Sequence, residues 1–120
     1  MAELVRNMME LVKNPEEVAN GGEVEIERFW TPSFIPFRVS RDAIQLYFDL
    51  EEETELNEID KFDKIAEFVA NEIYGGKFTK EDIYERLHGP NGKAVLEQQL
   101  IFVAQGQQSA DTKNFQAKKN

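Results

Sequence analysis

The sequence has no cysteine and a single histidine among its 120 residues. Without cysteine the chain can form no disulfide, no thiolate metal site and no thiol nucleophile. The histidine, His88, cannot supply a histidine pair for a metal, and the Glu85-to-His88 spacing occurs once, whereas a di-iron helix bundle needs it twice. Because catalysis requires positioned nucleophiles, bases or metals, these absences predict a protein that is not an enzyme and holds no metal or cofactor.

Long apolar runs are also missing, so no segment is predicted to cross a membrane. The first residues carry charges at Glu3, Arg6 and Glu10, whereas a signal peptide needs an uninterrupted apolar centre. We therefore expect the protein to stay in the cytoplasm in which it is made.

Basic residues are too few to balance the acidic ones, and the net charge at pH 7 is −9. Residues 107–120 hold three lysines and one aspartate, which leaves −11 for the rest of the chain. Binding to nucleic acid or to an anionic membrane relies on lysine and arginine. The charge therefore predicts neither of these partners and favours other proteins.

The length of the chain and its 41% content of hydrophobic residues suit one domain with one core. Residues 107–120 have almost no apolar side chains, and such segments cannot bury enough surface to fold by themselves. We predict a single helical domain over residues 1–106 and a flexible polar tail over residues 107–120.

Near the N-terminus, residues 3–13 have apolar side chains at helical spacing. Residues 1–20 are therefore expected to add a helix, which Asn14-Pro15 would end. In residues 23–30, apolar residues alternate with glutamates, and this period of two predicts a short strand or one half of a hairpin.

The remaining pattern predicts a mainly α fold of four to five helices, with the short N-terminal β-strand or hairpin and the flexible C-terminal tail. Ser40 is expected to cap a helix with an apolar stripe at Ala43, Leu46, Tyr47 and Leu50. The expected helices that follow cover residues 55–74, a short segment opened by a capping box at Thr79 and Asp82, and residues 92–105 after Asn91.

The connector before the Ser40 helix concentrates large apolar residues beside two prolines: Phe29, Trp30, Phe34, Ile35 and Phe37. These side chains either pack beneath the chain's own helices or form a partner-binding surface, since aromatic residues concentrate at binding hot spots. Arg38 and Arg41 are unusual in so acidic a chain, and they either contact the partner or pair with Asp42 or a nearby glutamate. We predict partner binding by the connector and these two arginines.

The apolar stripe of the 55–74 helix is wider than a single seam requires. Its residues either belong to the chain's own core or contact a second copy of the protein. Phe62, Phe68 and Val69 are the predicted self-association residues.

Three stretches carry a resemblance to a known family: TPSFIPFRVSRDAIQLYFDLE (31–51), FVANEIYGGKFTKEDIYERLHGP (68–90) and LEQQLIFVAQG (96–106). In this order and spacing they resemble the tail assembly chaperones of siphophages that infect Gram-positive bacteria. The resemblance covers about residues 23–120, and the chain departs from it in its first 20 residues.

The resemblance implies a protein that binds the tape measure protein, keeps it soluble and recruits tail tube (major tail) subunits. It also implies self-association around the tape measure, residence in the host cytoplasm during assembly, and absence from the mature virion. A longer form made by frameshifting is implied too, for which Lys118-Lys119-Asn120 would provide an A-rich slippery site. The alternative is a small structural component of the virion, such as a connector or tail-completion protein.

Overall fold

The computed structural model describes residues 3–52 and 57–119. Its elements, in chain order, are β1 (Met8–Val12), α1 (Pro15–Ala19), β2 (Ile26–Trp30), α2 (Phe37–Glu52), α3 (Glu58–Phe68), the π-helix η1 (Val69–Ile73), α4 (Lys80–Arg86), α5 (Gly89–Gln105) and α6 (Ala110–Lys119). The predicted mainly α fold with a short N-terminal hairpin is confirmed.

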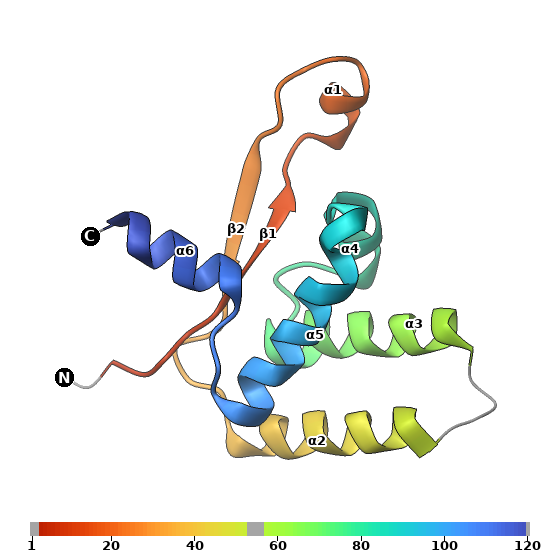
Figure 1. Ribbon diagram of the computed structural model, residues 1–120, viewed down its shortest axis with the longest axis vertical. Coiled ribbons are helices and arrows are strands. Elements are labelled where there is room, and N and C mark those ends of the chain that lie inside the picture. The colour runs from red at the N-terminus through yellow and green to blue at the C-terminus, as the bar shows by residue number, and fades with distance from the viewer. Residues whose placement is uncertain (1–2, 53–56, 120) are drawn as a thin grey trace.

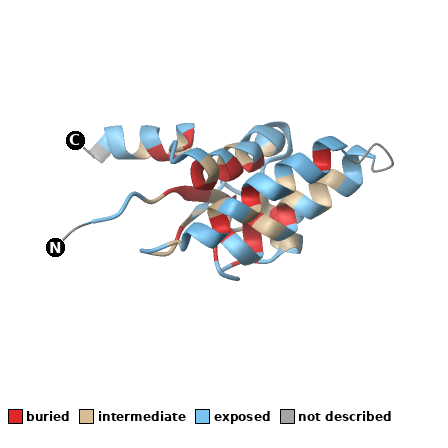
Figure 2. Ribbon diagram, turned by 90° about the horizontal axis from the view of Figure 1, so that it is seen from below, coloured by how far each residue is buried: buried red, intermediate tan, exposed pale blue. Residues whose placement is uncertain are grey.

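Helices α2 to α5 lie below and to the right of the hairpin in Figure 1, α6 lies to its left, and α1 lies in the connection between the two strands. Helices α2 and α3 run side by side, α5 crosses them and contacts α2 and η1, and α4 and α6 contact β1. Buried residues concentrate where these elements meet, and the outward faces of the helices are largely exposed (Figure 2). The arrangement places α2 at an edge of the molecule.

The predicted helix over residues 3–13 is wrong, because Met8–Val12 forms strand β1. It pairs antiparallel with β2 in a register that joins Met8 to Trp30. Met8, Met9 and Leu11 are all buried, so both faces of the strand are covered. A strand covered on both faces reads as a run of apolar residues, which periodicity cannot distinguish from a helix. The predicted second strand is confirmed as β2.

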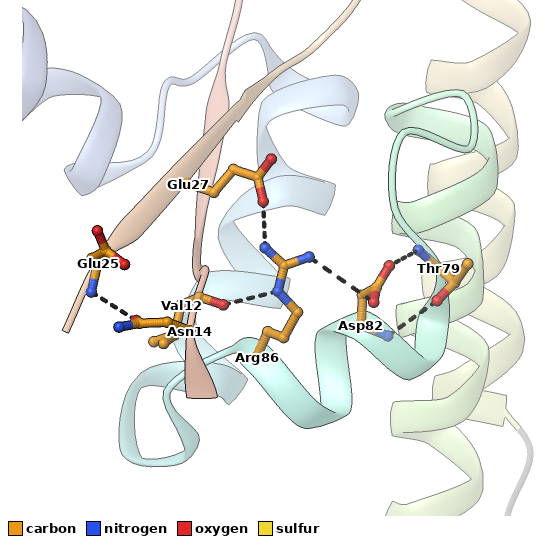
Figure 3. Close-up of polar contacts among 7 residues, drawn as sticks. All are labelled: Val12, Asn14, Glu25, Glu27, Thr79, Asp82 and Arg86. Atoms are coloured by element: carbon orange, nitrogen blue, oxygen red, sulfur yellow. Dashed lines mark hydrogen bonds and ion pairs between the residues drawn. The ribbon is translucent and has the colours of Figure 1, made fainter. Parts of the chain in front are cut away.

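Arg86 at the end of α4 fastens that helix to the hairpin (Figure 3). Its Nε donates a hydrogen bond of 2.8 Å to the carbonyl oxygen of Val12, and its Nη2 pairs with Glu27. The start of the same helix has the predicted capping box, in which Thr79 and Asp82 exchange hydrogen bonds between side chain and backbone. Both ends of α4 are therefore set by specific polar contacts.

Two helices begin earlier than the sequence pattern predicts. Helix α2 starts at Phe37, with the Val39 amide donating to the Pro36 carbonyl, so that Ser40 lies inside the helix. Helix α5 starts at Gly89, before Asn91, with proline in its first turn. Proline favours such starts because its fixed φ suits a helix and its missing N–H would have no partner there.

The predicted helix over residues 55–74 comprises two elements. Asn57 caps α3, its side chain accepting from the Asp60 amide, while residues 55 and 56 lie outside the described part of the chain. At Val69 the helix widens into η1, whose residues Val69, Ala70 and Ile73 are buried. Tyr74 follows and is also fully buried, so this widened turn forms the centre of the core.

The C-terminal residues differ from the predicted flexible tail, because Ala110–Lys119 forms α6 against β1. Thr112 is fully buried; its hydroxyl accepts from the Met8 amide at 3.0 Å and donates to Asn7 Oδ1 at 2.7 Å. Phe115 packs edge-on against Trp30. Buried hydrogen bonds of Thr112 anchor this helix, and apolar periodicity does not reveal such contacts.

Candidate partner-binding site

The aromatic connector divides into covered and uncovered side chains. Phe29 and Ile35 pack against the core, with the Phe29 ring 5.0 Å from that of Phe78. Trp30 is half-buried beneath Arg6 and against Phe115. These three predicted binding residues therefore contribute to the chain's own packing.

Phe34 and Phe37 remain in solvent, with 65% and 80% of their surfaces exposed. Phe34 lies beside Leu4 and Val5 at a shallow depression of about 250 Å³, and Leu4 and Val5 are themselves exposed. These two phenylalanines are the connector residues that remain accessible to a partner.

The two predicted binding arginines are exposed and paired with acidic residues. Arg38 lies 3.7 Å from Asp42 and 3.6 Å from Glu72, and Arg41 lies 2.9 Å from Asp42. The alternative of internal ion pairs is thus what the structure contains. Exposed pairs of this kind contribute little to stability, so both guanidinium groups can exchange partners at low cost.

The predicted self-association residues are not equally accessible. Val69 is fully buried and Phe68 packs against the core. Phe62 lines a groove at the surface. Phe68 also lines a shallow depression of about 300 Å³, so of the three only Val69 is closed to another chain.

That groove lies between α2, α3 and α5 and has a volume of about 470 Å³. A second depression of about 420 Å³ continues it along α2 and α5, and the two share Tyr47, Leu100 and Ile101. We call the two together the α2–α5 groove. Its apolar lining is Ala43, Ile44, Tyr47, Phe48, Leu50, Phe62, Ile65, Leu100, Ile101 and Ala104.

Helix α2 is apolar on two sides, which is why its outer side escapes the sequence pattern. Ala43 and Leu50, from the predicted stripe, are buried toward the core. Ile44 and Phe48 are exposed on the outer side, at 40% and 53%. A spacing of four residues places them on one face of the helix, and this spacing is the signal that identifies the outer face.

Charged groups border the groove. The Tyr47 hydroxyl hydrogen bonds to Glu51, and this bond and the charge of Glu51 raise the pKa of Tyr47, to which Glu97 adds. Lys93 pairs with Glu58 at 3.8 Å across one end. The groove thus has an apolar floor with a charged rim, an arrangement suited to binding an amphipathic protein segment.

Two further observations limit the chemistry of the described residues. No helix among them combines the length and apolar character needed to cross a membrane. Within the same residues, no three histidine, cysteine or acidic side chains are grouped so as to hold a metal ion.

A small helical protein with an uncovered apolar groove is the class that this fold and site define. The sequence matches the family described as phage tail chaperone protein over residues 3–120. The chain therefore belongs to the phage tail chaperone family, and strand β1 lies within the matched region. Neither a curated protein nor a solved structure matches the chain.

Proposed function

We propose that the chain binds the tape measure protein of its phage, keeps it soluble and recruits tail tube subunits during tail assembly. The observation that carries this proposal is the uncovered α2–α5 groove in a member of the tail chaperone family. A long apolar helical partner aggregates when its surface is bare, and covering that surface removes the cause.

Two surfaces would contact the partner. The groove would take apolar side chains through Tyr47 and Ile101, which are partly exposed and line both of its parts. Phe34 and Phe37 would extend the contact, and Arg38 would exchange its internal ion pairs for acidic groups of the partner. The net charge of −9 would remain on the outside and keep the complex soluble.

Co-expression with the tape measure protein of the same phage tests the proposal. We expect the tape measure protein to become soluble and to co-purify with this chain. The paired substitutions Tyr47→Ser with Ile101→Ser, and Phe34→Ser with Phe37→Ser, should each reduce the co-purified amount. Ile59→Ser is the matched control, since Ile59 is exposed and lines neither depression.

A tape measure protein that stays insoluble and unbound would overturn the proposal for this form of the chain. Mass spectrometry of mature particles tests the expected departure before completion. Stoichiometric amounts in the virion would instead support a structural component, such as a connector or tail-completion protein.

A further inference from the structure

The outer face of α2 carries a regular seam. Phe37, Arg41, Ile44, Phe48 and Glu51 follow one another at alternating spacings of four and three residues. This is the spacing at which one helix presents a continuous line of side chains to a second helix. All five residues are exposed, and the buried residues of α2 lie on the opposite side of the helix.

The charges along this seam change sign from one end to the other. Arg41 lies in its N-terminal half, and Glu51 and Glu52 lie at its C-terminal end. Two copies of α2 placed parallel would set Arg41 against Arg41 and Glu51 against Glu51. Two antiparallel copies would set arginine against glutamate twice, once at each end, as a two-fold interface requires.

We propose that two copies of this chain pair through the outer faces of α2 in an antiparallel, two-fold dimer. This interface goes beyond the proposed function, since it needs no other partner. Ile44 and Phe48 also line the α2–α5 groove, so a second copy and the tape measure protein would compete for this part of α2. We assign a second copy to this face because α2 runs from a basic to an acidic end. Two antiparallel copies therefore place the basic end of each helix opposite the acidic end of the other.

Two antiparallel registers each bring four of the five seam positions opposite one another. In the first, Ile44 opposes Phe48 of the second copy and Arg41 opposes Glu51. In the other, Phe37 opposes Phe48 and Arg41 opposes Ile44, which sets a charged group against an aliphatic one. Burying an unpaired charge is costly, so the first register is the one that the side chains favour.

The internal contacts of these residues do not oppose the pairing. Arg41 pairs with the adjacent Asp42 and Glu51 accepts from the Tyr47 hydroxyl, both on an exposed surface, where such contacts contribute little. Helix α2 has 16 residues and is therefore about 24 Å long. One helix pair of this length buries less surface than a typical stable complex, so we expect a dimer that forms with increasing concentration.

Charge reversal tests the pairing in the full chain by sedimentation equilibrium. Arg41→Glu and Glu51→Arg should each raise the dimer dissociation constant about tenfold, because close charge pairs across interfaces are strongly coupled. The double variant Arg41→Glu with Glu51→Arg should restore the wild-type constant, since it exchanges the two charges. Glu16→Arg, an equal charge change on exposed α1, should leave the constant unchanged.

Two outcomes would overturn the dimer: a wild-type chain that stays monomeric at millimolar concentration, or a double variant as weak as the single ones. Circular dichroism shows whether each variant is folded. None of these measurements involves the tape measure protein, so they succeed or fail independently of the proposed function.

The absence of cysteine allows the register to be tested directly. Two single variants, Ile44→Cys and Phe48→Cys, are mixed and oxidised, and their cross-linked products are separated by mass. We expect mainly the disulfide that joins one variant to the other, because a disulfide needs Cα atoms within about 7 Å. Same-variant disulfides dominating at both position 44 and position 48 would show parallel helices and overturn the proposal, because one antiparallel register can form at most one of the two. A same-variant disulfide at one position alone would overturn the register.

Discussion

The two ends of this molecule differ in the kinds of side chain that they bury and expose. Where α6 and α5 meet β1, polar groups are buried and fully hydrogen bonded. Gln99, which is 1% exposed, accepts from the Tyr74 hydroxyl at 2.5 Å and from the Asn7 side-chain Nδ2 at 3.1 Å. Where α2 meets α3 and α5, the α2–α5 groove leaves apolar groups in solvent.

The difference separates what holds the fold from what is available to partners. A buried polar group without a hydrogen bond costs free energy, so the network at β1 admits one arrangement and fixes how α5 and α6 sit. Exposed apolar groups have no such geometric requirement, and they gain free energy from whatever covers them. We therefore assign stability to the first end and binding to the second.

The largest effect should come from Gln99→Leu. This substitution leaves the Tyr74 hydroxyl, the side-chain Nδ2 of Asn7 and the Met8 carbonyl without their partner, and we expect the free energy of unfolding to fall by about 3 kcal/mol. Urea unfolding measures the change. Gln107→Leu at an exposed position is the control, and a loss at Gln99 no larger than at Gln107 would mean that the buried network contributes nothing.

Thr112→Val should have a smaller and more local effect. It keeps the shape of the side chain and removes the hydroxyl that joins α6 to Met8 and Asn7, at a cost of about 2 kcal/mol. Hydrogen exchange should show amides of residues 110–119 opening faster, while those of α5 keep their protection. Lys113→Ala, at an exposed neighbour, should change neither; uniform destabilisation of both helices would show that α6 and α5 unfold together.

The dependence of stability on pH should report the same network. Burial raises the pKa of the Tyr74 hydroxyl, whereas tyrosine in the unfolded chain ionises near about pH 10. The protonated Tyr74 hydroxyl therefore makes its full contribution to the free energy of unfolding below that pH. This contribution is lost as the pH rises through the folded pKa, by up to about 1.4 kcal/mol per pH unit. Unfolding measured between about pH 9 and about pH 11 should show a shallower decline for Tyr74→Phe. Equal slopes in the two proteins would contradict this assignment.

The smallest effect on stability is expected at the groove end. Phe48→Ser replaces a side chain that is about half exposed, so the free energy of unfolding should change by less than about 0.5 kcal/mol. Ile73→Ala, in the buried η1 segment, is the contrasting variant and should cost about 3 kcal/mol. A loss above about 1 kcal/mol at Phe48 would make the outer face of α2 part of the core and remove the contrast between the two ends.

Local signals in the sequence predict the helical elements well, because they act over a few residues. The capping box at Thr79, the end of the last long helix at Gln105 and the apolar spacing of α3 are all present in the structure. The alternation before Trp30 likewise predicts β2. Each of these features depends on neighbours three or four positions away, or on every second residue.

Features that depend on distant residues are the ones that the pattern misses. Strand β1 exists because α4, α6 and β2 surround it, and α6 docks because Thr112 reaches Asn7 across 105 positions. The predicted binding residues divide for the same reason: Phe29 meets Phe78, whereas Phe37 meets nothing that covers it. An apolar side chain is expected to be buried, but only the tertiary packing decides which apolar side chains are buried.

The sequence by itself determined an acidic, cysteine-free, mainly helical chain with the capping box of α4 in place and its family resemblance readable in three stretches. The tertiary structure decided which face of α2 is core and which is surface, how the first and last segments are joined, and where the groove lies. Periodicity shows that a helix has apolar faces, but the number of neighbours available to cover them is a property of the whole chain.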